Sequence, residues 1–193
     1  MVKESTFGSD SKLKSYRLFL YDEGGLWTGI EFYNARDSLQ TVSTYEYDDE
    51  GNRTRWNVYG GSRNLLSYTG YLYDGRGRLS EMNIYSPDGT LEDVFVYEYA
   101  GEGIHPVKQT MYTPAGGVVS IVESTIEKGL ILEQKTITPS GDLQFMTTCE
   151  YGERGELLRE SVFDASGTLM EYSRMEYILL EEVRLAEELD SQS

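Results

Sequence analysis

The chain has 193 residues, of which 33 are acidic and 17 are basic, for a formal net charge of −16. A charge of this sign disfavours phosphate backbones and anionic lipid surfaces, so we expect no nucleic-acid partner. Cys149 and His105 are the only residues of their kinds, which excludes an internal disulfide and a zinc site built from thiol or imidazole pairs. Since no stretch approaches the ~18 apolar residues of a membrane helix, we also expect no membrane span.

A period of 26 residues runs through the whole chain. In the fifth register Thr125 holds the tyrosine place, while Gly129 keeps the glycine. Self-similarity at a fixed period of this size indicates a repeat architecture. The repeated tyrosines are Tyr21, Tyr47, Tyr73, Tyr99, Tyr151 and Tyr177, and the glycines four residues after the first five of them are Gly25, Gly51, Gly77, Gly103 and Gly155.

Residues 1–6 are polar, and we expect them to form a flexible N-terminal segment ahead of a repeat domain that spans residues 7–177. The stretch from Phe7 to Leu13 already matches the stretch from Tyr33 to Leu39, 26 residues later. The array therefore opens in mid-repeat, which favours a removed leader or an upstream segment before Met1.

Each repeat unit contains two turns, as in Tyr73 to Leu79 and Tyr85 to Leu91. The sequence 87–89 is Pro-Asp-Gly, which suits a type I turn closed by a glycine bulge. The segments between turns have about seven to nine residues rich in Val, Ile, Thr, Tyr and Phe, which is typical of strands. We therefore predict an all-β fold, an antiparallel meander of about thirteen strands built from 26-residue β-hairpin repeats. Because natural twist disfavours a flat sheet about 60 Å wide, we expect a curled or spiralling single sheet.

Aromatic side chains recur in columns along the predicted sheet. Tyr45, Tyr71 and Tyr97 form one column, and alternation along the strands groups Trp56 with Met82 on the other face. Tyr45, Tyr71, Tyr97 and Trp56 are our candidate interaction surface, because aromatic rings on an extended sheet are good anchors for a partner. The alternative is that these rings only cover the sheet.

The repeat is irregular between residues 106 and 125. Pro106 falls at a strand position and cannot donate to the ladder, so it indicates a bulge or an edge. Glu123 and Thr125 replace the Tyr-x-Tyr pair of the other repeats. Repeat decay explains this most simply, and a functional patch is the alternative.

After Tyr177 the alternating pattern ends. Leu179, Val183, Ala186 and Leu189 follow helical spacing, so we predict an amphipathic helix over residues 178–190 that caps the last strand, then a frayed tail at 191–193.

The sequence offers no set of residues for catalysis. It has one histidine, one cysteine and no glycine-rich loop that opens a helix, so we expect no catalytic residue, no metal site and no cofactor. Cys149 stands in the column of Tyr45, Tyr71 and Tyr97, where it is best interpreted as a semi-buried filler.

The stretches Tyr45 to Arg53 and Tyr71 to Leu79 resemble the Tyr-Asp (YD) repeats of Rhs-type and teneurin-type proteins. That resemblance implies spiralling β-hairpin sheets that enclose or display other protein segments, and a location outside the cytoplasm, in the periplasm, on the cell surface or secreted. The Tyr-Asp pair itself stands only at residues 21–22, 47–48 and 73–74. The regular Tyr-x-x-x-Gly-x-Leu turns are also similar to the short repeats of MORN-like and antitoxin-like proteins.

These observations together predict a non-enzymatic interaction or scaffold module, an acidic sheet that presents aromatic surface to a protein partner. The alternative is binding of a carbohydrate or another small ligand in a groove of the curled sheet, with a glycan as the partner.

Overall fold

The computed structural model describes residues 1–177, and in this part of the chain every regular element is a β-strand. The fourteen strands are β1 (Val2–Phe7), β2 (Leu13–Tyr21), β3 (Trp27–Asn34), β4 (Leu39–Tyr47), β5 (Arg53–Gly60), β6 (Leu65–Tyr73), β7 (Leu79–Tyr85), β8 (Leu91–Glu98), β9 (Lys108–Tyr112), β10 (Val118–Glu127), β11 (Leu130–Ile137), β12 (Leu143–Tyr151), β13 (Leu157–Asp164) and β14 (Leu169–Arg174).

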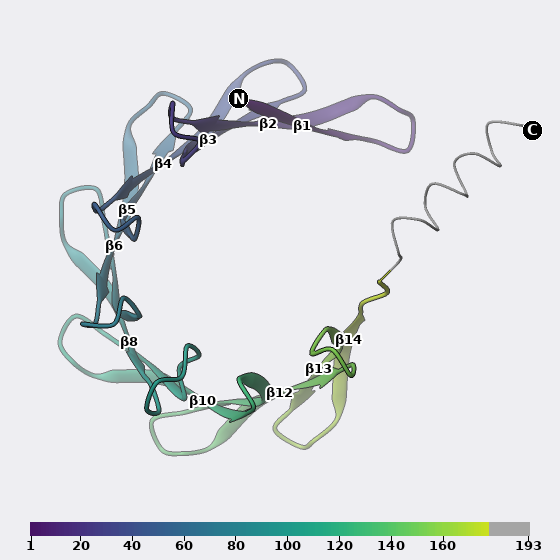
Figure 1. Cartoon of the computed structure of the whole chain (residues 1–193). Helices are drawn as coiled ribbons and strands as arrows, with labels where there is room; N and C mark the ends of the chain where they lie inside the picture. Colours follow the sequence, from purple (N-terminus) through teal and green to yellow (C-terminus); the bar gives the residue numbers. More distant parts are fainter. Residues whose placement is uncertain (178–193) are drawn as a thin grey trace, which may run out of the picture. The chain divides into compact units, whose positions relative to one another are not determined.

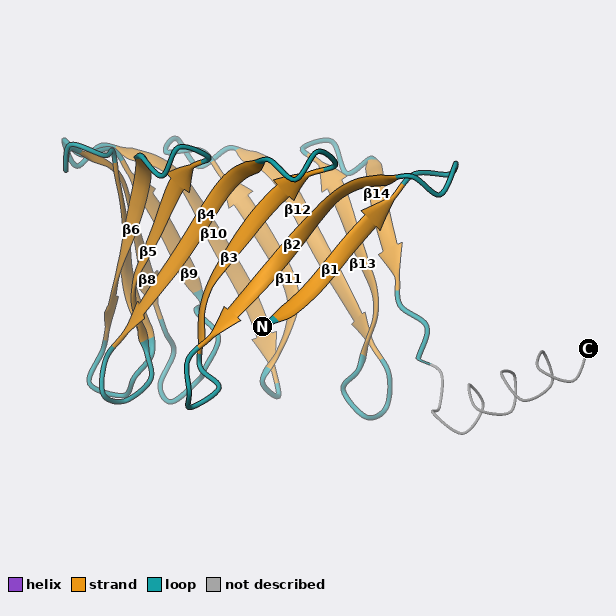
Figure 2. Cartoon of the chain, turned by 90° about the horizontal axis from the view of Figure 1, so that it is seen from above, coloured by secondary structure: helices purple, strands orange, loops and turns teal. Residues whose placement is uncertain are grey.

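The strands follow one another in the sheet in sequence order, from β1 to β14. The pairings that the structure describes are all antiparallel, as between β6 and β7. This confirms the predicted all-β meander of hairpins. The meander places successive loops at opposite ends of the strands, and Figure 2 shows them in this arrangement.

The chain divides into two compact units, Met1–Ser120 and Ile121–Ser193, with the boundary inside β10. In the first unit the sheet curls, and Figure 1 shows the ribbon from β1 to β8 following an arc. In the second unit, β11 to β14 continue the same hairpin pattern. The predicted helix at 178–190 and the tail at 191–193 lie outside the described residues.

The N-terminal segment differs from the prediction. Residues 2–7 form strand β1, which pairs with β2 from Val2 opposite Phe19 to Phe7 opposite Leu13. The reason is the repeat itself, because these residues stand one period before β3 and share its pairing pattern. Residues 1–6 are therefore not a flexible lead-in, and β1 brings the expected thirteen strands to fourteen.

The loop after β6 shows how the repeated Asp and Gly shape a hairpin. The amide of Asp74 donates to the carbonyl of Arg78 at 2.8 Å, and the amide of Gly77 donates to the carbonyl of Asp74 at 2.9 Å. The Asp74 carboxylate accepts from the amides of Arg76 and Arg78 at 2.9 and 3.0 Å. Gly77 has a φ of +74°, a left-handed conformation that only glycine adopts without a steric cost. Gly89, in the Pro-Asp-Gly turn of the next loop, likewise has a φ of +88°, as a glycine that closes the turn requires.

In most hairpins a bulge next to the loop changes which face the following side chains occupy. In the β6–β7 hairpin Leu72 pairs with Glu81 and Tyr73 pairs with Leu79, so Ser80 is an extra residue. Odd and even positions exchange faces at such a bulge. Faces therefore have to be assigned from the cross-strand pairs and not by counting along the strand.

The sheet is a single layer with little buried interior. Among the described residues, Tyr16 and Val42 are the only large apolar side chains that are buried. Most other strand residues are half-buried by their neighbours in the sheet. An antiparallel sheet of this kind is stabilised by cross-strand side-chain pairs on its two faces more than by a central core.

The repeat slips by one position between β8 and β11. Val94 corresponds to Tyr16 of β2, which pairs with Tyr33, so an unbroken repeat would place Met111 opposite Val94. The residue opposite Val94 is instead the next one, Tyr112. One extra residue therefore lies in the loop between β8 and β9. The two-residue turn Lys128-Gly129, with φ of +51° and +80°, restores the frame.

This slip corrects the prediction for residues 123 and 125. Ile126 pairs with Ile131, as Tyr151 pairs with Leu157, so Ile126 and not Thr125 occupies the tyrosine position. By the same shift Ser124, and not Glu123, stands in the column of Tyr45 and Tyr71.

Candidate functional site

In five repeats the repeated tyrosine fastens its strand to the strand before it. Its hydroxyl donates to the backbone carbonyl of the residue 20 positions earlier, at 2.6–3.0 Å. We call these bonds the tyrosine latches. They join Tyr47 to Trp27, Tyr73 to Arg53, Tyr99 to Leu79, Tyr151 to Ile131 and Tyr177 to Leu157. The fixed repeat period is thus a structural requirement, and these tyrosines are not free for chemistry.

A second set of aromatic rings lies side by side on one face of the first unit. The ring centroids of Trp27 and Tyr45 are 4.7 Å apart, and those of Tyr45 and Trp56 are 6.4 Å apart. Phe19 extends the row, with its centroid 6.3 Å from that of Trp27. Phe19, Trp27, Tyr45, Trp56 and Tyr71 form what we call the aromatic strip.

The Arg53 guanidinium lies among these rings. Its central carbon is 4.4 Å from the centroid of Tyr45, 5.9 Å from that of Trp27 and 6.0 Å from that of Tyr71. A guanidinium at these distances from ring faces is held by cation–π attraction. Two buried donors, Arg53 Nε and Trp56 Nε1, have no hydrogen-bond partner in the part of the chain that the structure describes. The strip thus combines adjacent aromatic rings, one cation and two side-chain donors without a hydrogen-bond partner.

The structure brings the sequence-predicted surface residues to one face. Trp56 pairs directly with Tyr45, so the expectation that Trp56 lies on the opposite face is wrong. Met82 likewise pairs with Phe95, on the face that carries Tyr71 and Tyr97. The error came from the bulges, which exchange odd and even positions between neighbouring strands.

Sequence reasoning missed Trp27 and Arg53. Both stand at the repeat position that Leu79, Ile131 and Leu157 hold elsewhere, and they pair with Tyr21 and Tyr47, the repeated tyrosines of the preceding strands. The sequence signal that could have identified them is the replacement of the aliphatic residue that other repeats have at this position. Burial raises the pKa of the Tyr45 phenol, and Arg53 partly offsets this effect. The phenol therefore stays neutral and able to donate.

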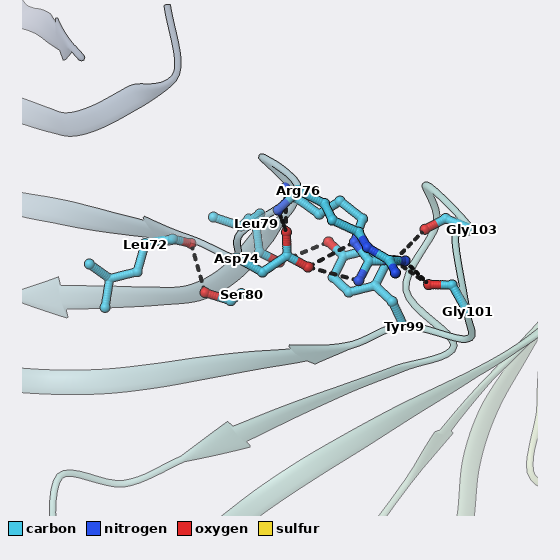
Figure 3. Close-up of polar contacts among 9 residues, drawn as sticks. Leu72, Asp74, Arg76, Leu79, Ser80, Tyr99, Gly101 and Gly103 are labelled. Atoms are coloured by element: carbon cyan, nitrogen blue, oxygen red, sulfur yellow. Dashed lines mark hydrogen bonds and ion pairs between the residues drawn. The ribbon is translucent and has the colours of Figure 1, made fainter. Parts of the chain in front are cut away.

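The irregular region begins in the loop between β8 and β9, residues 99–107, which we call the rim loop. Arg78 Nη1 donates to the carbonyls of Gly101 and Gly103 at 3.0 and 2.9 Å, and Arg76 donates to Gly101 at 2.8 Å (Figure 3). Arg78 is itself held by Asp74 at 2.8 Å and lies 4.3 Å from the Tyr99 ring centroid. The rim loop is therefore anchored by arginine from the adjacent hairpin.

Pro106 lies in this loop and not inside a strand, since β9 begins only at Lys108. Its missing donor therefore breaks no ladder bond. Glu123 and Thr125 are far along β10, where they pair with Lys135 and Glu133. The structure does not gather these three residues into one site.

Cys149 is half-buried on β12, and burial raises the pKa of its thiol. This direction is opposite to the activation of a nucleophilic thiolate. Within residues 1–177, no three His, Cys, Asp or Glu side chains come close enough to hold a metal ion. No helix in this described range is both long and apolar enough to cross a membrane.

Comparisons with known proteins found no matching family model and no matching curated protein. Solved structures do match. A porin-like protein from Bacteroides uniformis has 14% identity and a TM-score of 0.48, over 90% of this chain and 96% of that one. A protein of unknown function from Bacteroides fragilis has 11% identity and a TM-score of 0.33, over 70% and 92%. The complex TcdB2-TccC3-Cdc42 has 12% identity and a TM-score of 0.31, over 87% of this chain but 13% of that one. No family follows from these matches.

Proposed function

We propose that the protein is a non-enzymatic interaction module whose aromatic strip receives a protein partner. The observation that carries this proposal is the strip itself, a row of adjacent aromatic rings around Arg53 on one face of a single-layer sheet. Tyr, Trp and Arg are the residue types that contribute most binding energy at protein interfaces.

The unused donors of the strip specify part of the partner's chemistry. Arg53 Nε and Trp56 Nε1 lie beside the rings, so a partner that brings a carbonyl or carboxylate oxygen would satisfy them after small side-chain shifts. The partner segment is therefore expected to combine an apolar side chain, which stacks on the rings, with hydrogen-bond acceptors.

The test compares Tyr71→Ala with Leu72→Ala. The two residues are neighbours on β6 and point to opposite faces, and Leu72 is 54% exposed. A partner captured by the wild-type protein should bind Tyr71→Ala at least about 10-fold more weakly in calorimetry, as expected for an interface hot spot, and bind Leu72→Ala normally. Equal binding by two folded variants, or a Tyr71→Ala variant that is simply unfolded, would remove the support for this face.

A carbohydrate or small ligand is the second candidate. A shallow depression lies on the same face, beside the strip, and is lined by Arg17, Ile30, Phe32, Thr41 and Ser43. A guanidinium, two hydroxyls and an aromatic ring are groups that can hold a sugar or a small acid. A glycan panel that gives no signal at high protein concentration would count against this candidate.

We also propose that the repeats are of the Tyr-Asp kind and that the protein works outside the cytoplasm. The roles of Tyr73 in a latch and Asp74 in the adjacent loop give the Tyr-Asp pair a structural reason. Fractionation of the producing cells tests the location, and recovery of the protein in the cytosolic fraction would contradict it.

A further inference from the structure

The two outermost strands of the described sheet, β1 and β14, expose all of their residues. These strands also carry large apolar side chains with more than 40% of their surface exposed. An open edge with such side chains is a template for another strand. The exposed apolar residues of the two edges are Val2, Phe7, Leu169, Met170 and Tyr172.

Alignment of the repeats indicates which strand could pair with each edge of the sheet. β14 begins at Leu169, six repeat periods after Leu13 in β2, and pairs with β13 as β2 pairs with β1. In the sheet, the other neighbour of β2 is β3. The edge of β14 that pairs with no strand of the described residues is therefore shaped for a strand of the β3 type. β1 is such a strand, because its residues stand one period before those of β3.

If β14 pairs with β1 in the same register as β2 pairs with β3, two exposed aromatic residues come to face each other. Tyr16 stands opposite Tyr33 in that register, which places Tyr172 opposite Phe7. Two such pairs inside the sheet are stacked, with centroids 4.7 and 4.6 Å apart and ring planes within 12° of each other. These two pairs are Tyr16–Tyr33 and Tyr68–Tyr85.

Exposure shows what the edges lack. Tyr16 is 8% exposed with its partner in place, whereas Tyr172 and Phe7 are each 58% exposed. Each edge thus carries one half of a stack that the interior of the sheet completes.

The charges agree with the same register. This register places Glu176 opposite Lys3, which forms a pair of opposite charges. Arg174 comes to lie opposite Ser5, and no two like charges lie directly opposite each other. Opposite charges directly across an antiparallel pair are favourable. The net charge of −16 on each copy repels at long range, and salt screens this repulsion.

We propose that two copies of this chain associate head to tail, with β14 of one copy paired antiparallel to β1 of the other in the β2–β3 register. The contact uses two different edges, so a dimer keeps one free edge of each type and can add further copies or close into a ring. The proposal concerns the strand edges and is independent of the aromatic strip.

Crosslinking tests the register. In a Cys149→Ser background, we mix Thr6→Cys protein with Ser173→Cys protein, since the same register places these two residues opposite each other and leaves the aromatic pair intact. Treatment with a short bismaleimide should give a covalent product of twice the 21.9 kDa chain mass. Each protein alone should give much less of it. The matched control is Leu72→Cys, which is also exposed but lies on the central strand β6, mixed with either variant.

Two outcomes would overturn the proposal. One is a yield no higher than that of the Leu72→Cys control. The other is a product confined to single chains when both cysteines are on one molecule, because this would show β14 pairing with β1 of its own copy.

Mass measurements test the association without crosslinks. By light scattering at physiological or higher salt, the wild-type mass should rise above 21.9 kDa with concentration. Tyr172→Ala should weaken association by roughly 2- to 10-fold, the range expected for one aromatic stack. Lys3→Glu and Glu176→Lys should each weaken self-association, while a mixture of the two variants should restore it. A wild-type protein that stays monomeric at every concentration would refute the pairing.

Discussion

The hydroxyl of the repeated tyrosine is the polar tip of a ring that otherwise packs on the sheet. It satisfies a carbonyl at the beginning of the preceding strand, as Tyr99 does for Leu79 at 2.8 Å. A single-layer sheet has few buried apolar contacts, so bonds of this kind contribute a larger share of its stability than in a protein with a thick core. This explains why tyrosine and not phenylalanine recurs at this position.

Replacing Tyr99 by Phe keeps the ring and removes the latch. We expect the free energy of unfolding to fall by about 0.5–1.5 kcal/mol, the net contribution of one hydrogen bond, as measured by urea denaturation. The matched control is Tyr97→Phe on the same face, because Tyr97 forms none of the latches. A Tyr99→Phe protein as stable as the control would show that the latch contributes nothing.

Three turns in the first unit hold a non-glycine residue in the left-handed conformation that later repeats give to glycine. Ser11, Asp37 and Arg63 have φ of +57°, +62° and +61°. Ser11→Gly relieves this strain, and we expect a gain of about 0.5–1 kcal/mol in urea denaturation after the entropy cost of glycine. Asp37→Gly should gain less, since the Asp37 carboxylate also accepts a hydrogen bond from the Tyr16 hydroxyl. Loss of stability in Ser11→Gly would contradict the strain argument.

Within the β6–β7 hairpin, the hydrogen bonds that the Asp74 carboxylate accepts in the turn make the stability of the fold depend on pH. Hydrogen bonds from the Arg78 amide, the Arg78 side chain and the Arg76 amide lower its pKa from 3.8 to about 2. A carboxyl group whose pKa is lower in the folded state stabilises the fold above its unfolded pKa, and this contribution disappears as the pH falls through the folded pKa.

Wild-type protein should therefore lose stability between about pH 4 and pH 2 more steeply than Asp74→Asn. The measurement is the urea midpoint at several pH values, and the two curves should converge toward pH 2. Parallel curves would mean that the Asp74 charge is not coupled to folding.

Arg78 connects two hairpins, since it binds Asp74 in its own loop and two carbonyls of the rim loop. Its side chain is 18% exposed, so its bonds are partly shielded from water. Arg78→Ala should cost about 2 kcal/mol and speed amide hydrogen exchange at residues 100–107. Arg76→Ala, which removes one exposed bond to Gly101, should have a smaller effect. Unchanged exchange in the rim loop of Arg78→Ala would show that the loop holds its shape without this anchor.

Across the whole molecule, each strand interacts chiefly with its sequence neighbours, as in other repeat proteins. A local lesion should therefore stay local. Tyr151→Phe removes the latch to Ile131, and we expect faster hydrogen exchange in β11 to β13 with little change in β3 to β5. Equal loss of protection in both regions would indicate one global cooperative unit.

The sequence predicts the repeats, the hairpins and the all-β meander, because tyrosine and glycine recur at fixed spacing for steric and hydrogen-bonding reasons. It does not predict the face of Trp56, since one bulged residue such as Thr54 exchanges odd and even positions. The 26-residue spacing also assigns Thr125 to the tyrosine position by mistake. The extra residue in the rim loop is compensated by the shorter turn at Lys128-Gly129, so the spacing of the later repeats does not reveal the shift. Comparing the same position in successive repeats does not reveal Arg53, because its role depends on contacts with rings from neighbouring strands.

The cancelling slip between β8 and β11 bears on how such a chain tolerates changes in length. One residue is gained in the rim loop, and the two-residue turn at Lys128-Gly129 recovers the frame one hairpin later. Only β9 and β10, between these two loops, are shifted by one residue from the repeat. The next latch, from Tyr151 to Ile131, has the usual spacing of 20 residues. A single-residue insertion in one loop can thus be repaired by a deletion two loops later, which lets hairpin repeats of this kind drift in length without losing their shared architecture.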